Sequence, residues 1–483
     1  MDQIISFLEK IVVNINAYLS NYVLILLLVG TGVYYSVRTR FVQIRCFGEG
    51  MKKVFGGIKL FGGKNSGGLS SFQALVTAIA AQVGTGNIVG ACGAILVGGP
   101  GAIFWMWVIA FFGMATIYAE AVLAQETKIA DENGEIHGGP VYYIKRAYKG
   151  GFGKFLAVFF AVAIVLALGF IGGMVQSNSI AQTTGVALGV QPWIIGLILT
   201  AVCAIIFLGG IQRIASVAEK IVPIMAVLYL TLGLIVLGLN FKVIPETFML
   251  IFKYAFAPDA LLGGTFGACI MAAISQGAKR GLFSNEAGMG STPHAHAQAN
   301  VEKPHDQGVV AMIGVFIDTF IVLTMTALVV ISTLYAGDGP LSSSAYQGGS
   351  LIEGLKIGGQ EVSNANLMQL AMGKHFGTTA GNILVAICLM FFAFTTIIGW
   401  NFFAKINIQY LFKNNKIATA AFSVIAVGFI FLGSCIDKVN LVWELADMFN
   451  NLMVIPNVIG LIPLAAIVAS AAKSSKKESK LKK

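Results

Sequence analysis

The sequence predicts an all-α polytopic membrane protein with eleven transmembrane helices. The composition is the first observation, because 57% of the 483 residues are hydrophobic and only 11% are charged, whereas soluble domains carry about 25% charged residues. The second is a series of apolar runs of roughly 20 residues, the length that crosses a bilayer. The third is the gathering of basic residues in every other connecting segment, an alternation that a wrong number of spans would scramble.

The expected transmembrane segments follow one another from near the N-terminus to the tail. They lie at residues 20–37, 70–98, 101–125, 155–176, 191–209, 217–239, 264–284, 309–335, 381–404, 417–436 and 449–472. The first residues, MDQIISFLEK, lack the basic start and short apolar core of a cleaved signal, so we expect no removed leader. The long polar segment 336–380 is expected outside, as a lid or a short hairpin.

The basic residues predict how the chain is oriented. With the N-terminus outside, all but six of the 32 lysines and arginines fall in inside segments. Lys and Arg concentrate on the cytoplasmic side of membrane proteins, so we expect an outside N-terminus and a cytoplasmic C-terminus. The basic tail KKESKLKK is then attracted to membrane lipid. The net charge of +10 therefore needs no nucleic-acid partner.

The cysteines give no sign of a disulfide framework or a metal site. They are scattered, mostly in apolar runs, with no CxxC or Cys/His spacing, at Cys46, Cys92, Cys203, Cys269, Cys388 and Cys435. We interpret them as packing residues.

The second span contains a predicted break in its helix. Gly84 and Gly86 stand near mid-membrane depth, flanked by Gln82, Thr85 and Asn87. Backbone groups at that depth need partners inside the protein, because lipid offers none. Glycine for close helix packing is the alternative, but it does not account for clustered amide and hydroxyl side chains. We therefore expect an unwound segment here.

The seventh span is expected to break as well. Its short apolar part is followed by Ser275, Gln276 and Gly277, and then by two basic residues before Gly281. The alternative is an ordinary helix that ends at Ser275 and continues as a basic loop.

The positions of the two breaks predict an inverted repeat. Each break opens a group of five spans, and because five is odd the two groups insert in opposite orientations. The expected units are an extra N-terminal helix with a basic loop (1–69), two five-helix repeats (70–240 and 241–472) and a basic tail (473–483). Interrupted helices at corresponding positions of inverted repeats indicate a transporter's binding site. Free N–H groups at such a break suit a carboxylate, and freed carbonyls suit Na⁺ or an ammonium group.

Two motifs resemble the signatures of a known family. VGTGNIVG in the second span and ISQGAKRGLFSNEAGMGSTPHAHA in the seventh look like those of the alanine or glycine:cation symporter family, within the amino acid–polyamine–organocation superfamily. The resemblance implies a LeuT-type five-plus-five inverted repeat with one extra N-terminal helix. It also implies uptake of alanine and glycine across the cell membrane, driven by Na⁺ or sometimes by H⁺.

The resemblance implies a Na⁺ site where the second and ninth spans meet. Its ligands would be the carbonyls of Ala80, Val83 and Phe392 and the hydroxyls of Thr395 and Thr396. Without the resemblance, these hydroxyls are equally suited to bond carbonyls of their own helix.

Three further polar residues receive roles at the two breaks. Asn87 matches the amide ligand of a second ion site, whereas Asp318 stands where the family pattern has an amide. Asp318 is therefore an ion ligand, a proton carrier or a hydrogen-bonding partner of another helix. Glu120, by resemblance, ties the unwound backbone near Ser275–Gly277. The alternative places Glu120 at the cytoplasmic interface.

The expected substrate site lies between the two breaks. Gly84 to Gly86 and the Thr85 hydroxyl would hold the carboxylate, and amides with nearby carbonyls would hold the ammonium group. Trp400 and Phe170 would limit the side chain to a methyl group, although both also suit plain packing. The full set is Gln82, Gly84, Thr85, Gly86, Phe170, Ser275, Gln276, Gly277 and Trp400.

Other functional classes fit the sequence less well. A channel would need repeated subunits or filter loops, and an intramembrane enzyme would need a paired acid and base at depth. The absence of a Walker motif from the sequence argues against nucleotide as the energy source. An H⁺-coupled amino-acid transporter of the same superfamily stays the nearest alternative to Na⁺ symport.

Overall fold

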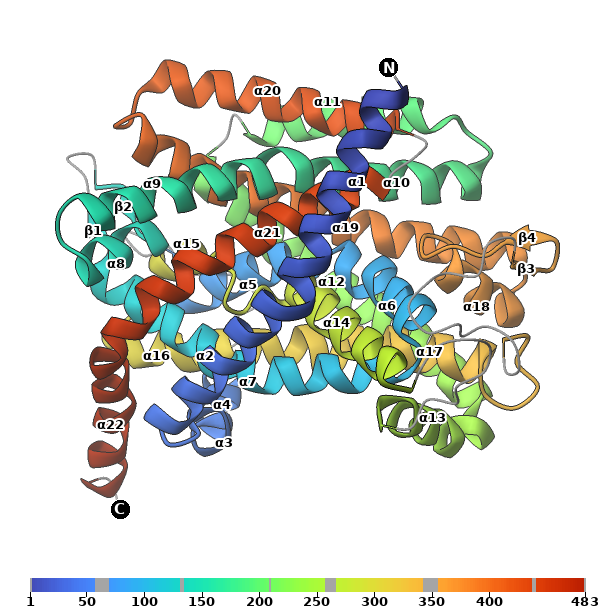
Figure 1. Cartoon of the computed structure of the whole chain (residues 1–483), viewed down its shortest axis with the longest axis horizontal. Helices are drawn as coiled ribbons and strands as arrows, with labels where there is room; N and C mark the ends of the chain where they lie inside the picture. Colours follow the sequence, from blue (N-terminus) through green and yellow to red (C-terminus); the bar gives the residue numbers. More distant parts are fainter. Residues whose placement is uncertain are drawn as a thin grey trace.

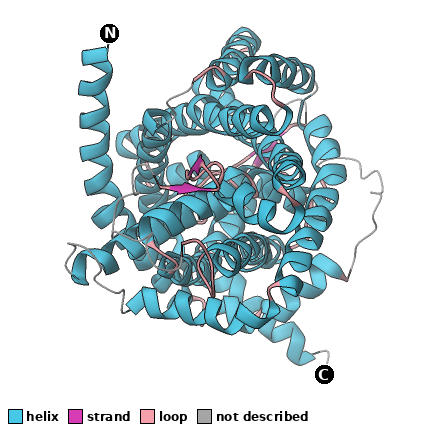
Figure 2. Cartoon of the chain, turned by 90° about the vertical axis from the view of Figure 1, so that its right-hand side faces the viewer, coloured by secondary structure: helices cyan, strands magenta, loops and turns pink. Residues whose placement is uncertain are grey.

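The computed structural model describes residues 2–56, 69–130, 134–207, 210–256, 266–341, 355–436 and 440–481. Most of the long helices run along the longest axis of the molecule and pack side by side (Figure 1). The N-terminal helix crosses the front of the bundle in Figure 1, and Figure 2 shows its beginning set apart from the bundle.

The N-terminal region consists of one long helix and two short ones. The elements are α1 (Asp2–Tyr18), the π-helical turn η1 (Leu19–Leu24), α2 (Ile25–Arg38), α3 (Val42–Arg45) and α4 (Phe47–Phe55). The first three follow one another without a break, and residues Lys10–Arg38 form a span of 29 residues.

The expected break in the second span is present. Helix α5 (Ser71–Gln82) starts with a capping box between Ser70 and Gln73, and the chain re-enters a helix at η2 (Gly86–Gly90), which continues as α6 (Ala91–Gly98). The two halves are bent by 50°. Val83 between them is extended, with φ −79° and ψ 91°.

The chain then passes through the remaining elements of its first half. They are α7 (Gly101–Thr127), β1 (Ile129–Ala130), β2 (Ile136–His137), α8 (Pro140–Ala147), α9 (Gly151–Ile164), η3 (Val165–Gly172), α10 (Gly173–Leu188), α11 (Pro192–Phe207), α12 (Gly210–Leu239), η4 (Phe241–Val243) and α13 (Ile244–Phe256). The strands β1 and β2 pair antiparallel, with Ile129 opposite His137.

The second half contains one very long helix, α19, and a second small hairpin. Its elements are α14 (Phe266–Asn285), α15 (Pro293–Ala297), α16 (Pro304–Val315), η5 (Phe316–Leu323), α17 (Thr324–Leu334), β3 (Lys356–Ile357), β4 (Gln360–Glu361), α18 (Leu367–Phe376), α19 (Thr378–Leu411), α20 (Lys416–Ser434), α21 (Asn440–Leu461), η6 (Ile462–Leu464) and α22 (Ala465–Leu481). Strands β3 and β4 form the short hairpin that was one expectation for segment 336–380. Residues 342–354 of that segment lie outside the described residues.

The prediction of a second break at Ser275–Gly281 was wrong. Helix α14 runs through these residues without interruption. Gly277 is needed there for close packing, because a Cβ would lie 2.6 Å from the Trp105 Cβ on α7. The helix ends about two turns later, at Asn285, and the chain becomes irregular before α15 begins at Pro293.

Within the described residues, eight helices are long and apolar enough to cross a membrane, and the bent pair of α5 with η2 and α6 makes nine. Helix α11, with 16 residues, is a shorter apolar helix. The protein is thus a helical polytopic membrane protein, as expected.

A short ladder of backbone hydrogen bonds joins two segments that lie far apart in the sequence. Leu69, just before α5, donates its N–H to the Gln298 carbonyl at 3.0 Å and accepts from the Asn300 N–H at 2.8 Å. The start of the first broken helix is therefore tied to the segment that follows α15.

Candidate functional site

The first break frees the carbonyl of Ala80, near the end of α5, and that of Val83, just after α5. Their usual helical partners would be the N–H groups of Gly84 and Asn87. The Gly84 N–H instead donates to the Asn87 side-chain oxygen at 2.9 Å, and the Asn87 N–H points to the Gly84 carbonyl at 3.2 Å. The carbonyls of Ala80 and Val83 are thus available to a partner outside their own helix.

That partner is α19, through Thr396. Its hydroxyl lies 3.2 Å from the Ala80 carbonyl oxygen, 3.3 Å from that of Val83 and 3.1 Å from that of Phe392. Thr395 places its hydroxyl 3.0 Å from the same Phe392 carbonyl, and also bonds Phe391 on its own helix. The structure therefore brings together all five oxygens that the sequence assigned to a Na⁺ site.

Gly84 allows this close approach. A Cβ on Gly84 would lie 2.4 Å from the Thr396 hydroxyl oxygen, which is far inside van der Waals contact. The next residue, Thr85, donates its N–H to the side-chain oxygen of Gln176 on α10 at 3.2 Å. The break is thus held between α19 and α10, and Gln176 is a contact that the sequence reasoning missed.

The second break lies at residues 286–292, after α14. Glu286 adopts a left-handed backbone with φ 57°, and Gly288 and Gly290 follow with φ 89° and 81°. The buried Glu286 carboxylate accepts hydrogen bonds from the Trp400 indole N–H at 2.5 Å and from the Ser291 hydroxyl. Glu286 was not singled out from the sequence, although its place just before two closely spaced glycines was a usable signal.

The two breaks meet through the end of α14. A Cβ on Gly86 would lie 3.1 Å from the Ser284 Cα, and the Gln82 side-chain amide donates to the Asn285 carbonyl at 2.7 Å. Gln82 and Gly86 therefore lie where two interrupted helices touch, as expected.

Three predicted substrate residues lie elsewhere. Ser275 donates its hydroxyl to Asn21 on η1, Gln276 packs against Gly98 on α6 and Gly277 packs against α7. The structure does not bring Ser275, Gln276 and Gly277 to the breaks, because α14 stays helical there and these residues contact neighbouring helices.

Trp400 lies at the junction, whereas Phe170 does not. The Trp400 ring is 1% exposed, meets the Phe283 ring edge to face at 5.7 Å and lies against Gly172, where a Cβ would be 2.6 Å from its ring. Phe170 stacks on Phe429 of α20 at 4.9 Å instead. Residues two apart on a helix face opposite sides, so the contact of Gly172 with Trp400 turns Phe170 away. The structure therefore does not place Phe170 opposite Trp400, where the sequence reasoning expected it.

Asp318 joins both interrupted helices. Its carboxylate in η5 is fully buried, and it accepts from the Asn87 amide at 2.6 Å, the Ser284 hydroxyl at 2.8 Å and the Thr319 hydroxyl at 2.9 Å. Asn87 comes from the first break and Ser284 from the last turn of α14. The predicted pair of Asn87 and Asp318 is therefore in direct contact.

Glu120 also supports an unwound segment, but not the one expected. Its carboxylate on α7 accepts from the Gly288 N–H at 3.2 Å and from the Asn457 amide at 2.6 Å. The Asn457 amide also donates to the Gly288 carbonyl at 2.9 Å. Glu120 is 0% exposed, so it is not an interface residue. Its partner is Gly288 instead of Ser275–Gly277, because the break itself lies later in the chain.

Three buried polar atoms beside the first break have no hydrogen-bond partner among the described residues. They are the Thr85 hydroxyl oxygen, the Gln176 side-chain nitrogen and the Gln82 side-chain oxygen. Thr85 and Gln176 are both 0% exposed. A buried polar group without a partner costs about 1–3 kcal/mol, so these atoms are suited to receive a polar ligand.

Aromatic and charged side chains are stacked next to Trp400. Phe283 contacts Trp443 on α21 at 5.1 Å between ring centroids, and the Arg280 guanidinium lies 4.9 Å from the Trp443 ring. Asp447 pairs with Lys279 at 2.7 Å and with Arg280 at 3.3 Å. This stack joins α14 to α21.

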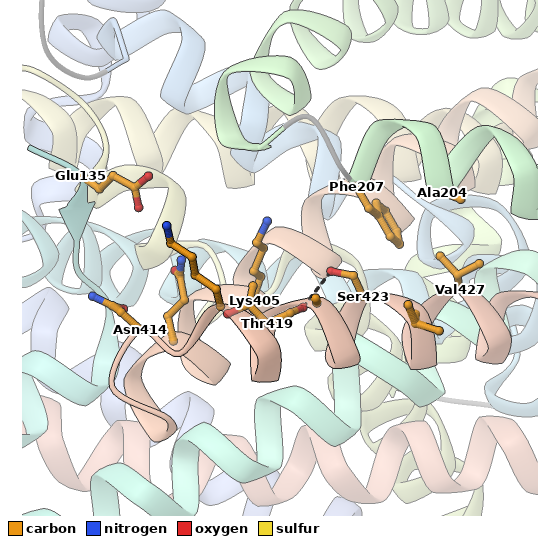
Figure 3. Close-up of a pocket in the computed structure, with 12 residues that line it drawn as sticks. Glu135, Ala204, Phe207, Lys405, Asn414, Thr419, Ser423 and Val427 are labelled. Carbon is orange, nitrogen blue, oxygen red and sulfur yellow. Dashed lines mark hydrogen bonds between the residues drawn. The ribbon is translucent and has the colours of Figure 1, made fainter. Parts of the chain in front are cut away.

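A cavity of about 760 Å³ lies apart from both breaks. Figure 3 shows Glu135, Lys405 and Asn414 toward one end and Phe207, Ala204 and Val427 toward the other. It is lined by α11, α19 and α20 with residue 135, and none of the predicted site residues lines it.

Two interrupted helices that touch at their breaks inside an apolar bundle are typical of secondary transporters. The family model described as "Sodium:alanine symporter family" matches residues 5–483. The chain belongs to this family of sodium-coupled amino-acid symporters, and it is a transporter of the cell membrane and not an enzyme.

Three relatives match over nearly their whole length. The chain is 40% identical over 470 residues to the "Sodium/alanine symporter AgcS" of Methanococcus maripaludis, covering 96% of both chains. It is 40% identical over 474 residues to the "Putative sodium/proton-dependent alanine carrier protein YrbD" of Bacillus subtilis, covering 97% and 93%. It is 39% identical over 473 residues to the "Probable sodium/glutamine symporter GlnT" of the same organism, covering 98% and 92%.

Proposed function

We propose that this protein takes up a small neutral amino acid, alanine or glycine, together with Na⁺ by alternating access. The observation that carries this proposal is the cluster of oxygens around Thr396, because it joins the freed carbonyls of Ala80 and Val83 to α19. Five uncharged oxygens suit a monovalent cation that binds weakly enough to leave again. Na⁺ bound there would bridge α5 and α19, so the ion gradient would bias the conformational equilibrium.

The substrate carboxylate, in this proposal, binds beside the first break. The Thr85 hydroxyl and the Gln176 side-chain nitrogen are both donors, both buried and both without a partner among the described residues. The sequence-based expectation also used the backbone of Gly84 to Gly86 to hold the carboxylate. We leave that backbone out, because the N–H groups of Gly84 and Thr85 already donate to side chains. The ammonium group would face the freed carbonyls of α5.

In this proposal, Trp400 and Phe283 limit the size of the substrate's side chain. Their rings meet edge to face at 5.7 Å next to the first break, and the Glu286 carboxylate fixes the indole of Trp400. A fixed ring leaves room for a small side chain and excludes a long one. The relative named as a probable glutamine symporter marks the competing assignment, a larger polar amino acid.

The proposed topology has eleven spans in two inverted repeats. Helices α11 and α14 would add to the nine spans counted by length and composition. Each break then follows the first helix of a repeat, α5 in one and α14 in the other. The short helices α3, α4 and α8 and the C-terminal α22 lie toward the same end of the molecule (Figure 1). Their basic residues support a cytoplasmic location for that end.

Proton coupling is the second candidate, and Asp318 favours it. A buried carboxylate that accepts three hydrogen bonds and touches both interrupted helices is placed to carry a proton or to bind a second cation. The relative described as sodium/proton-dependent is consistent with either ion.

Uptake by purified protein in proteoliposomes distinguishes these assignments. Radiolabelled alanine, glycine and glutamine are each offered with an inward Na⁺ gradient alone, an inward H⁺ gradient alone, or neither. We expect accumulation of alanine or glycine with Na⁺ alone. Accumulation with the H⁺ gradient alone would replace the Na⁺ assignment, and accumulation of glutamine in preference to alanine would replace the substrate assignment.

A further inference from the structure

A second cluster of ligand-type side chains lies outside the transport site. Cys46 is the N-cap residue of α4, Glu49 lies in the first turn of α4, and His305 lies in the first turn of α16. Their ligand atoms, a sulfur, a carboxylate oxygen and an imidazole nitrogen, all lie within 4.8 Å of one another. Cys46 and His305 are each 3% exposed, whereas the Glu49 side chain is 36% exposed.

We propose that Cys46, Glu49 and His305 form a Zn²⁺ site that fastens α4 to α16. Thiolate, imidazole and carboxylate are the three protein ligands that zinc uses. Three protein ligands leave the fourth tetrahedral position for water. Cys46 caps α4 and Glu49 lies in its first turn, so both ligands lie at the same end of α4.

The distance between His305 and Glu49 favours a metal over a direct hydrogen bond. Both Glu49 carboxylate oxygens lie 3.4 Å from the His305 Nε2, which is longer than the usual 2.7–3.2 Å of an N–H···O bond. Two ligand atoms at zinc distances of about 2.0–2.1 Å with a tetrahedral angle are roughly 3.4 Å apart. The observed separation matches the one that a bound zinc ion would set between these two ligand atoms.

The other ring nitrogen of His305 has the partner that a metal ligand needs. Its Nδ1 lies 2.7 Å from the Tyr118 hydroxyl on α7. Metal-bound histidines almost always use their second nitrogen in such a hydrogen bond, which fixes the ring and its tautomer. Tyr118 thereby directs Nε2 toward Glu49 and Cys46.

The surroundings hold the two helices in place and give access. Gly50 packs against α16, where a Cβ would lie 2.8 Å from the Val309 carbonyl oxygen, and Lys53 pairs with Asp306 at 3.0 Å. A separate cavity of about 630 Å³ reaches His305 beside α22. Zinc entering from it would displace the thiol proton of Cys46 to water, so affinity is expected to fall at low pH.

Zinc binding to the full-length protein in detergent tests the proposal. After metal removal, Zn²⁺ is titrated in competition with a chromophoric zinc indicator. We expect one bound zinc per chain, and at least tenfold weaker binding in Cys46→Ser, Glu49→Gln and His305→Gln. Tyr118→Phe is a positioning variant, expected to weaken binding by about 10- to 100-fold. Cys435→Ser and His375→Gln, whose residues lie outside the cluster, are the matched controls and should bind as the parent does.

A second measurement covers the case in which a variant fails to fold. Co²⁺ in place of Zn²⁺ gives a thiolate-to-cobalt charge-transfer band in the parent protein, with no substitution needed. We expect this band, and its loss on addition of excess Zn²⁺. Absence of the band, or equal zinc affinity in the parent and Cys46→Ser, would overturn the site. Neither measurement depends on transport activity, so the proposed transport function is tested separately.

Discussion

The Thr396 hydroxyl is the sharpest test of the proposed Na⁺ site. It contacts three carbonyl oxygens at 3.1–3.3 Å, and Thr396→Val removes it while keeping the shape of the side chain. A hydrogen-bonding contact to a charged group contributes about 1.5–3 kcal/mol. Loss of one such contact to Na⁺ corresponds to roughly a 10- to 150-fold weaker affinity.

The assay is the Na⁺ concentration that gives half-maximal alanine uptake into proteoliposomes. We expect it to rise at least tenfold in Thr396→Val and to stay within about threefold in Thr396→Ser, which keeps the hydroxyl. Melting temperature without Na⁺ serves as the folding control. An unchanged Na⁺ dependence in a folded Thr396→Val protein would refute the site, because among the described residues the Thr396 hydroxyl alone contacts all three carbonyls, whereas that of Thr395 reaches only Phe392.

Four other substitutions probe the breaks and their supports. Trp400→Ala should admit leucine or methionine in competition uptake, and continued exclusion of both would remove Trp400 from the pocket wall. Asp318→Asn should abolish pH-dependent uptake if the carboxylate carries a proton, or lower the Na⁺ stoichiometry if it binds an ion; no change in either would reduce it to a structural contact. Glu120→Ala leaves the Gly288 N–H and the Asn457 amide without this acceptor, so thermal melting should show a loss of about 2–4 kcal/mol, and unaltered melting would contradict this. Gly277→Ala meets Trp105 at 2.6 Å and should lose about 1–3 kcal/mol, whereas Gly281→Ala, with its nearest atom at 3.8 Å, should melt as the parent does.

The sequence predicted the fold best where polar residues stand at a depth at which a membrane span is normally apolar. Two glycines among amides in the middle of an apolar run have few explanations, so the break at Gly84 was predicted correctly. The same reasoning failed at Gly277, because a helix contact with α7 also requires glycine there. Lys279 belongs to the polar stretch from which that second break was predicted, but Asp447 on the distant α21 pairs with it inside the bundle. Such compensation depends on tertiary contacts that one sequence does not reveal.

The candidate site also contains some residues that the sequence identified and others that it missed. Thr396, Asn87 and Glu120 were found because they match a family pattern. Gln176 was missed because one amide on an otherwise ordinary helix carries no local signal. Glu286 was missed because a left-handed conformation is not expected of a glutamate. Cys46 and His305 lie far apart in the chain, so the search for closely spaced metal ligands passed over them.

The ladder at Leu69 has a consequence for the transport cycle. It is one of three links between the interrupted helices, together with Gln82 to Asn285 and the carboxylate of Asp318 between Asn87 and Ser284. Three non-collinear attachments remove the relative rotations and translations of two bodies. The two broken helices are therefore expected to rock as a single lever against α19, so that one ion bound between α5 and α19 would act on both broken helices at once.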